Sequence, residues 1–354
     1  MKVFSVVGAR PQFIKARPLS TALEASGVSE FLLHTGQHYD AGMSERFFTE
    51  LGLRLPNVNL GIGSGPHGAQ TGRMLAGIEE HLVQWKPDVL LIYGDTNSTV
   101  AAALAAAKLH IPIAHVEAGL RSRNRRMPEE INRVIADHLS ARLYCPSAEA
   151  AANLIAEGIH DGVEIVGDVM HDALRYFLPI AMQRSDVLDR LALSERNYHV
   201  ATLHRADLTD DATLLKGMLC ALGELDRPVI LPLHPRTRAR LEALAWSPPA
   251  GSKLLLISPL GYLDMLRIVA SADRVITDSG GLQKEAYWLR RPCVTLREET
   301  EWTETVAAGW NRLAGTSASA LRQAIGIAPA ADHPPLYGDG HAAGRIVESL
   351  HSLV

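Results

Sequence analysis

The stretch "DVLLIYGDTNSTVAAALAAAKLHIPIAHVEAG", residues 88–119, contains the pattern that decides the fold. Its first apolar run ends at Asp95, an alanine-rich segment follows, and a second apolar run ends at Glu117. The alanine-rich segment contains Lys108 and is broken by Pro112, which predicts a buried helix followed by a strand, with no membrane span. A strand, a helix and a second strand in this order indicate parallel strands with a crossover helix between them.

Similar runs recur along the whole chain and set its domain organisation. The first half contains "KVFSVVG", "EFLLHTG", "DVLLIYGD", "IPIAHVE", "ARLYCPS" and "VEIVGD", and the second half contains "YHVATLHR", "PVILPLHP", "LLLISPLG", "DRVITDSGG" and "PCVTLRE". We therefore predict two doubly wound α/β domains, residues 1–170 and 171–338, and a C-terminal helix within 339–354 that packs back on the first domain. Ligands of such sheets bind beyond the carboxyl ends of the strands, so two facing domains predict one central cleft.

Composition excludes several classes of protein. The chain has 354 residues and a net charge of −4, which argues against nucleic acid as the main partner. Its three cysteines, Cys145, Cys220 and Cys293, are far apart and form no CxxC pair, which fits a reducing compartment and gives no structural zinc site. The N-terminal "MKVFSVVGAR" lacks the features of a signal peptide, so we expect a cytoplasmic protein without a membrane span.

The stretch "TDSGGLQKEA", residues 277–286, has the composition of an anion-binding site. Ser279 begins a turn after a strand, and Gly280 and Gly281 allow the backbone to approach a ligand where a helix begins. The first N–H groups of that helix would point at a phosphate. Glu285, one turn further on, is placed to reach ribose hydroxyls. The alternative is that Ser279 only caps the helix and that the glycines serve only the turn.

Cations and histidines at other strand ends are further candidates for phosphate contacts. The stretch "VVGARPQFIK", residues 6–15, is neither a GxGxxG nor a Walker sequence, but Arg10 and Lys15 would suit a diphosphate. His204 and His234 both end strands of the second domain, where each could hold a phosphate or donate a proton to a departing one. A structural role is the alternative for each histidine. The histidines form no HExxH or similar pattern, so we predict no required metal.

Three acids are candidates for proton transfer. Asp95 and Glu117 each end a strand of the first domain, and Glu129 lies at a helix start with Arg133 one turn on. Crowded, partly desolvated carboxylates have raised pKa values, so one can hold a proton while another is ionised. Structural ion pairs are the alternative for any one of these acids, but three acids converging near a phosphate site favour catalysis.

Taken together, these stretches resemble the non-hydrolysing UDP-N-acetylglucosamine 2-epimerases over nearly the whole chain. The resemblance rests on "GARPQFIK", "TGQH", "GDTNST", "HVEAGLRS", "PEEINR", "HR", "DSGGLQKEA" and "YGDG". It implies two Rossmann-like domains of the GT-B type, a homodimer, a UDP-sugar bound between the domains and no nicotinamide cofactor. It also implies inversion at C2 by elimination of UDP and its return through a 2-acetamidoglycal.

The resemblance also suggests a substrate. The stretches "RMPEEINR", "GDVM", "LPLHPRTR" and "TEW" are most similar to members that act on UDP-2,3-diacetamido-2,3-dideoxy-glucuronic acid, a precursor of O-antigen or capsule sugars, and UDP-GlcNAc is the second choice. "TGQHYDAGMS" departs from a segment associated with allosteric UDP-GlcNAc binding, and "TEWTE" departs near the sugar pocket. A uronate substrate requires another cation, for which Arg121, Arg123 and Arg126 are candidates.

The roles implied by the resemblance divide between the two domains. Arg10, Lys15, His204 and the helix start at Ser279 to Gly281 would offset the charge of the departing diphosphate. Asp95, Glu117 and Glu129 would move protons near C2 and C1, with Arg133 orienting Glu129.

Two rival hypotheses remain open from the sequence. A GT-B glycosyltransferase uses the same fold and the same UDP-sugar donors, so fold analogy does not separate it from an epimerase. A catalytically silent nucleotide-sugar sensor would bind the UDP-sugar without exchanging any hydrogen.

Overall fold

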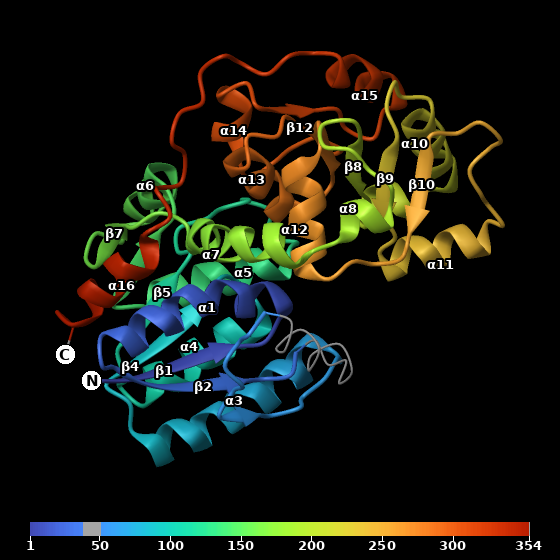
Figure 1. Ribbon diagram of the computed structural model, residues 1–354. Coiled ribbons are helices and arrows are strands. Elements are labelled where there is room, and N and C mark those ends of the chain that lie inside the picture. The colour runs from blue at the N-terminus through green and yellow to red at the C-terminus, as the bar shows by residue number, and fades with distance from the viewer. Residues whose placement is uncertain (38–50, 354) are drawn as a thin grey trace. The chain divides into compact units, whose positions relative to one another are not determined.

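The computed structural model describes residues 1–37 and 51–353, which fold as two compact units. One unit contains Met1–Tyr176 and Tyr337–Val354, and the other contains Phe177–Leu336. The first crossing between the units therefore lies inside helix α7 (Val169–Arg184) (Figure 1). The units are described separately below.

The first unit is built on a seven-stranded parallel sheet with the strand order β3-β2-β1-β4-β5-β6-β7. Its strands are β1 (Lys2–Val7), β2 (Ser29–His34), β3 (Val58–Asn59), β4 (Val89–Tyr93), β5 (Ile113–Val116), β6 (Arg142–Cys145) and β7 (Val163–Ile165). Every residue of β4 and β5 is buried, as expected for central strands that are covered on both faces. The carboxyl ends of these two neighbouring strands lead into Asp95 and Glu117.

Helix α4 shows why the alanine-rich segment folds as predicted. Thr96 caps the helix by accepting a hydrogen bond from the Thr99 backbone N–H, and nine of its twelve residues are buried. Small side chains let α4 pack closely between α3 and α5. The helices in the described part of this unit are α1 (Arg10–Ala25), α3 (His67–Trp85), α4 (Asn97–Lys108), α5 (Pro128–Leu139), α6 (Ala148–Ala156), the start of α7, and α16 (Ala342–Leu350). The predicted buried helix followed by a strand is confirmed.

The C-terminal helix α16 belongs to the first unit and packs against α1 (Figure 1). One face of α16 is buried, including Ile346 and Leu350. Asp172 accepts hydrogen bonds from the backbone N–H groups of Ala342 and Ala343, which satisfies two of the donors left open at the helix start. The last residues of the chain therefore complete the packing of the first unit.

The second unit repeats the same architecture with a six-stranded parallel sheet in the order β10-β9-β8-β11-β12-β13. Its strands are β8 (His199–Thr202), β9 (Val229–Pro232), β10 (Leu254–Ile257), β11 (Arg274–Thr277), β12 (Cys293–Thr295) and β13 (Asn311–Leu313). Its helices, after the end of α7, are α8 (Val187–Arg190), α9 (Ala206–Thr209), α10 (Ala212–Gly223), α11 (Pro235–Ala243), α12 (Tyr262–Ser271), α13 (Gly280–Trp288), α14 (Thr303–Ala307) and α15 (Ala318–Ile325).

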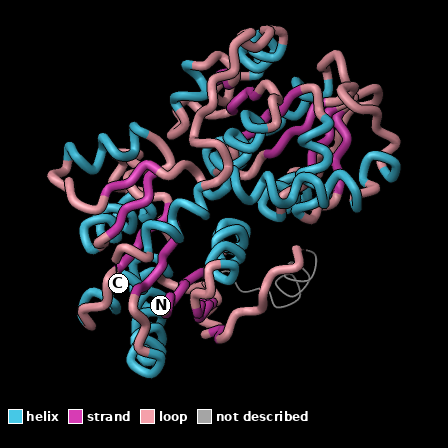
Figure 2. Tube along the Cα trace, turned by 60° about the vertical axis from the view of Figure 1, so that its left-hand side comes forward, coloured by secondary structure: helices cyan, strands magenta, loops and turns pink. Residues whose placement is uncertain are grey.

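In each unit the strands form an interior layer with helices around it (Figure 2). In the second unit, separate apolar cores lie on the two faces of the sheet. The first unit has a large apolar core under α3, α4 and α5 and a smaller one beside β6 and α6. These cores are built mainly from Val, Ile, Leu and Ala side chains. The predicted class of two doubly wound α/β domains is confirmed. No helix in the described part of the chain is long and apolar enough to cross a membrane.

Candidate active site

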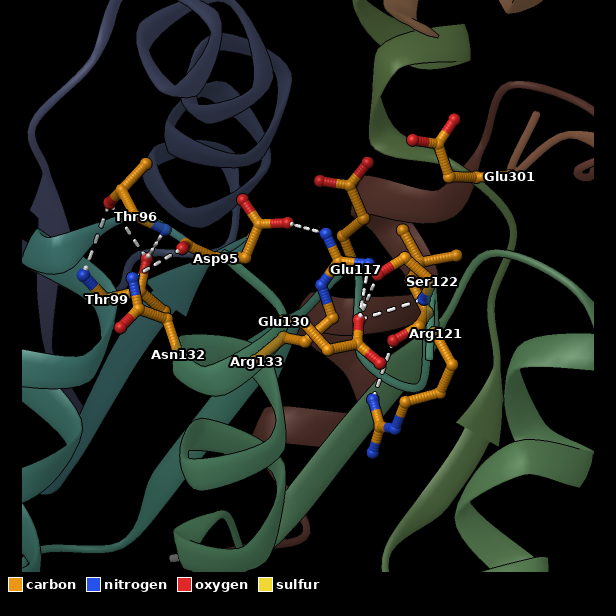
Figure 3. A network of polar contacts seen from close by, with 12 residues as sticks. Asp95, Thr96, Thr99, Glu117, Arg121, Ser122, Glu130, Asn132, Arg133 and Glu301 are labelled. Carbon is orange, nitrogen blue, oxygen red and sulfur yellow. Dashed lines mark hydrogen bonds and ion pairs between the residues drawn. The ribbon is translucent and has the colours of Figure 1, made fainter. Parts of the chain in front are cut away.

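Two carboxylates lie at the carboxyl ends of adjacent strands in the first unit, and each forms an ion pair. Asp95 follows β4 and pairs with Arg133 of α5, while Glu117 follows β5 and pairs with Lys15 of α1. The Glu117 side chain is 9% exposed and the Asp95 side chain is 29% exposed. Figure 3 shows Asp95 facing Arg133, with Glu117 close by. The structure thus brings four of the predicted residues together.

Burial and neighbouring charges shift the pKa values of Asp95 and Lys15. Burial raises the pKa of Asp95 above its ordinary value; the charge of Arg133 lowers it, and the nearby charge of Glu117 raises it again. Burial alone would lower the pKa of Lys15, but the carboxylate of Glu117 raises it above the ordinary lysine value. Lys15 therefore remains a cation beside Glu117, and Asp95 holds a proton more readily than an ordinary aspartate does. A pair of acids in different environments can both take and give protons.

The backbone at Glu117 is in the left-handed region, with φ of 71°. A residue with a Cβ is disfavoured there by about 1 kcal/mol or more. The turn is held because the N–H groups of Glu117 and Ala118 both donate to the Tyr144 carbonyl of β6. This backbone conformation sets the direction in which the Glu117 side chain leaves the end of the strand.

Glu129 and Glu130 occupy different surroundings in the first turn of α5. Glu129 is exposed, whereas Glu130 is 4% exposed and accepts hydrogen bonds from the backbone N–H groups of Ser122 and Arg123 and from the Ser122 hydroxyl. Arg133, which was expected to orient Glu129, instead pairs with Asp95 and lies 3.4 Å from Glu130. The expected contact with Glu129 is wrong because the backbone N–H groups at 122–123 need an acceptor and Glu130 provides it. Glu130 therefore points inward, and Glu129 faces solvent.

This difference predicts opposite results for two variants. Glu130→Gln is expected to lower the free energy of unfolding by about 1–3 kcal/mol, because a buried charged acceptor of three hydrogen bonds loses its charge. Glu129→Gln is expected to leave stability unchanged and to lower kcat, the role that the sequence predicts for this acid. Thermal unfolding and steady-state kinetics on both variants provide the comparison, and normal turnover in Glu129→Gln would remove that residue from the mechanism.

Other polar residues near Asp95 were not predicted from the sequence. Asn132 donates to the Asp95 carbonyl at 3.0 Å and to Asn97 at 3.2 Å, so α5 holds the turn after β4 (Figure 3). Gln12 donates to the Tyr93 carbonyl at 2.6 Å and accepts from the Gly8 backbone N–H at 2.7 Å. Both lie inside the quoted "PEEINR" and "GARPQFIK" stretches, but only the fold shows which member of a stretch turns inward.

The cations proposed for a uronate carboxylate are placed differently from one another. Arg121 is almost fully buried and pairs with Asp137 and Glu157, so its guanidinium is already occupied and this candidate is corrected. Arg123 is exposed and donates to the Asn153 side chain at 2.9 Å, and Arg126 is exposed. Arg10 begins α1, but its side chain lies outside the described residues, as does most of the stretch "TGQHYDAGMS".

The second unit presents a histidine–carboxylate pair at the carboxyl ends of two adjacent strands. His204 follows β8 and Asp278 follows β11, and His204 Nδ1 lies 2.9 Å from Asp278 Oδ1. The other oxygen of Asp278 accepts from the backbone N–H groups of His204 and Arg205, at 2.6 and 2.8 Å. Burial alone would raise the pKa of Asp278, but these hydrogen bonds and the charge of His204 bring it below the ordinary value. Asp278 therefore stays ionised and lies in ion-pair contact with the His204 ring.

His234 lies beside His204 but at a helix start. The two rings are 5.4 Å apart, and His234 Nδ1 accepts a hydrogen bond from the Arg236 backbone N–H as the cap of α11. Burial lowers the pKa of His234, and the charge of His204 lowers it further. The structure thus brings the two predicted histidines together, one held by a carboxylate and the other by a helix cap.

The two glycines that begin α13 have open space around them. Ser279 makes no side-chain capping hydrogen bond to the helix; its own N–H donates to the Thr277 hydroxyl at 2.9 Å. A Cβ added at Gly281 would meet nothing within 4 Å, and one added at Gly280 would come no closer than 3.5 Å to another atom. Neither glycine has positive φ, so the turn itself does not require glycine. Glu285 accepts a hydrogen bond from the Tyr262 hydroxyl at 3.4 Å.

Gly281→Ala is expected to separate stability from binding. Alanine is a better helix former, so the free energy of unfolding should rise by about 0.5–1 kcal/mol. If the helix start receives a phosphate, the added methyl group should weaken UDP binding. Chemical denaturation and calorimetric titration with UDP measure the two effects, and unchanged UDP affinity would contradict the anion site.

Metal binding has no support among the residues that the structure describes. No cluster of three or more His, Cys, Asp or Glu side chains there is placed to hold a metal ion. The chemistry available from the described groups is proton transfer by carboxylates in the first unit, and anion binding by histidine and backbone N–H groups in the second.

Comparison with known proteins gives these groups a context. Residues 21–351 match the model of the family described as UDP-N-acetylglucosamine 2-epimerase. The chain is 49% identical over 358 residues to a UDP-N-acetylglucosamine 2-epimerase homolog of Methanococcus maripaludis, with 100% of both chains covered. It is 47% identical over 366 residues to the UDP-2,3-diacetamido-2,3-dideoxy-D-glucuronate 2-epimerase of Pseudomonas aeruginosa, again with 100% of both covered.

A solved structure extends the similarity to three dimensions. The Methanocaldococcus jannaschii UDP-GlcNAc 2-epimerase, crystallised in complex with UDP-GlcNAc and UDP, matches with a TM-score of 0.88 and 41% identity. The match covers 99% of this chain and 100% of that one. Fold, sequence and the extent of the match agree, and the chain belongs to the UDP-N-acetylglucosamine 2-epimerase family, whose activity is an isomerisation.

Proposed function

We propose that this chain is a non-hydrolysing epimerase that inverts C2 of a UDP-2-acetamido sugar. The observation that supports this most is the pair of carboxylates, Asp95 and Glu117, at the ends of adjacent strands, each beside a cation. Epimerisation requires one group to remove a proton from C2 and another to return a proton to the opposite face. Two acids in unlike environments suit that requirement.

The proposed reaction couples proton transfer to loss of the nucleotide. A carboxylate takes the C2 hydrogen as a proton, the C–H electron pair forms the C1=C2 double bond, and the C1–O bond breaks to release UDP. The intermediate is a 2-acetamidoglycal. A protonated carboxyl then delivers hydrogen to the other face of C2, and a UDP oxygen returns to C1. No electrons are gained or lost overall, so the cycle needs no redox partner.

We assign the nucleotide to the second unit. UDP gains charge as the C1–O bond breaks, and this charge is offset by His204 and the backbone N–H groups at Ser279 to Gly281. His234 and Glu285 complete the proposed contacts, with Arg10 and Lys15 of the first unit as further cations. Asp95, Glu117 and Glu129 are the proposed proton-transfer groups, and Arg133 holds Asp95.

For the substrate we propose UDP-2,3-diacetamido-2,3-dideoxy-glucuronic acid first and UDP-GlcNAc second. The support is the 47% identity to a Pseudomonas aeruginosa enzyme named for the diacetamido substrate. The product would be the manno epimer, a precursor for O-antigen or capsule. A kcat/KM higher for UDP-GlcNAc than for the uronate, measured side by side, would reverse this order.

Two further expectations complete the proposal. We propose a homodimer, which light scattering on the purified protein tests. We also propose a cytoplasmic location, supported by the free thiols of Cys145, Cys220 and Cys293.

Incubation with the UDP-sugar in heavy water, with no acceptor present, tests the reaction class. The proposal predicts deuterium at C2 in both epimers. A GT-B glycosyltransferase would leave C2 unlabelled, a silent sensor would bind the UDP-sugar without any exchange, and a hydrolysing enzyme would accumulate free sugar and UDP.

A further inference from the structure

A buried histidine lies beneath both acid-bearing turns of the first unit. His115 belongs to the all-buried strand β5 and is fully buried itself. Its Nδ1 lies 2.7 Å from Asp137 Oδ1 on α5, and its Nε2 lies 2.7 Å from the Gly94 carbonyl oxygen. A carboxylate and a carbonyl oxygen only accept hydrogen bonds, so the ring satisfies both contacts when each nitrogen donates a hydrogen.

Each end of this arrangement holds one of the two turns. Gly94 immediately precedes Asp95, has φ of 59°, and donates its N–H to the Val116 carbonyl at 3.0 Å. The carbonyl of that same glycine is the one that receives His115 Nε2–H. The hydrogen bond from His115 Nε2–H thus fixes the orientation of the peptide unit between Gly94 and Asp95, next to which the Asp95 side chain begins.

Asp137 holds the other turn. Its Oδ2 accepts from the Gly119 backbone N–H at 3.2 Å and from Arg121 Nη1 at 2.7 Å. Gly119 ends the turn that begins at Glu117. Burial alone would raise the pKa of Asp137, but the hydrogen bond and charge of His115 and the charge of Arg121 bring it below the ordinary value. The carboxylate is therefore an anion at neutral pH and can accept from His115 and Gly119 together.

We propose that His115 and Asp137 are positioning residues that set the placement of Asp95 and Glu117 relative to each other. The ring forms a two-donor clamp: Nε2–H holds the Gly94–Asp95 turn, and Nδ1–H holds Asp137, which in turn holds the Glu117–Gly119 turn. The inference rests on the proposed function, because the two acids must reach opposite faces of one sugar carbon. Both clamp residues are fully buried, so we assign neither of them a contact with the substrate.

The second unit offers a comparison for buried histidine as such. His199 is also buried and lies 3.3 Å from Asp226 and 3.6 Å from Asp273. His199 is the first residue of β8, however, and His204 follows the other end of the same strand. The two histidines therefore lie at opposite ends of the strand. His199 is therefore buried next to carboxylates, as His115 is, but its acidic neighbours are not linked to a predicted site residue.

The test compares His115→Gln and Asp137→Asn with His199→Gln. Glutamine can donate to one of the two acceptors but not to both. We expect the rate of C2 deuterium exchange to fall by about 10- to 100-fold in both clamp variants, because small misplacement of reacting groups is costly. KM and the Kd for UDP should stay within about twofold of wild type, since substrate and transition state lose no direct contact. His199→Gln should lower Tm and leave kcat unchanged.

A second measurement does not depend on catalysis, and its deciding observation uses the wild-type protein alone. In wild-type protein with ¹⁵N-labelled histidine, both ring nitrogens of His115 should show a directly bonded hydrogen, and Asp137→Asn should remove or weaken the Nδ1 signal. Hydrogen on only one nitrogen would overturn the clamp. Wild-type kcat in His115→Gln, or an equal fall in His199→Gln, would overturn the positioning role.

Failure of the proposed function gives a different pattern. If wild-type protein exchanges no hydrogen at C2 of any UDP-2-acetamido sugar, the epimerase proposal is wrong. The nitrogen-bound hydrogens of His115 then decide by themselves whether the clamp exists.

Discussion

Glu117→Gln is expected to lower the rate of deuterium incorporation at C2 by about a hundredfold or more. Glutamine has nearly the same shape but neither accepts nor releases a proton in the required range. The variant also leaves Lys15 without its carboxylate partner in a largely buried place. UDP binding, measured by calorimetric titration, should remain measurable because most of the proposed nucleotide contacts belong to the second unit.

Asp95→Asn provides the companion measurement. Burial raises the pKa of Asp95 in the folded protein, so the substitution removes a carboxyl group that holds a proton more readily than an ordinary aspartate. A similar hundredfold fall is expected. Glu80→Gln, an exposed glutamate on α3, serves as the control and should leave kcat unchanged. Turnover near wild type in both Glu117→Gln and Asp95→Asn would contradict the assignment of proton transfer to these acids.

His204→Ala is the second variant with a large expected effect, a fall in kcat of about a hundredfold. Asp278 lies 2.9 Å from Nδ1 of this ring, so we propose that Nε2 is the nitrogen that contacts the departing phosphate. The loss should appear in kcat with UDP binding still measurable, because the charge to be offset grows as the C1–O bond breaks. Steady-state kinetics measures the change in kcat, and calorimetric titration measures the change in UDP affinity.

Asp278→Asn tests whether the carboxylate acts through the histidine. An asparagine cannot supply the negative charge, so His204 should lose its orientation and kcat should fall by about tenfold or more. In a His204→Ala background the Asp278→Asn change should add little, because the ring through which it acts is gone. Fully additive losses would contradict that dependence. His160→Ala, at an exposed position, is the control.

The sheet architecture could be predicted because its strands are almost fully buried. A run such as Val89–Tyr93 is apolar at every position, and its ends are marked by Pro87 before it and Gly94 after it. Strands β3 and β13 were not predicted. They are two and three residues long and lie at sheet edges, where partial exposure removes the apolar signal.

The candidate site could be predicted only in part, because sequence order gives strand ends but not side-chain direction. Asp95 and Glu117 follow adjacent strands and were found for that reason. The sequence could not show that Glu130 is buried and Glu129 exposed, because this depends on the backbone N–H groups at 122–123 that donate to Glu130. The sequence pattern pointed to Ser279 and the two glycines and not to Asp278, although Asp278 is the carboxylate that pairs with His204.

The partner of Lys15 was also beyond the reach of the sequence. A cation on a strand-to-helix loop suggests a diphosphate, but 102 residues separate Lys15 from the carboxylate that it contacts. Only the parallel order of β1, β4 and β5 brings α1 and the end of β5 together. Long-range pairing of this kind requires the register of the whole sheet.

Positional isotope exchange on the wild-type protein tests the central claim most directly. The substrate carries ¹⁸O in the bridge between C1 and the β-phosphorus, and the reaction is followed by ³¹P and ¹H NMR in heavy water. We predict that ¹⁸O moves from the bridge to the non-bridging β-phosphate positions while C2 gains deuterium, because UDP departs and returns in each cycle. Deuterium at C2 with ¹⁸O retained in the bridge would show that the C1–O bond stays intact and would contradict the account.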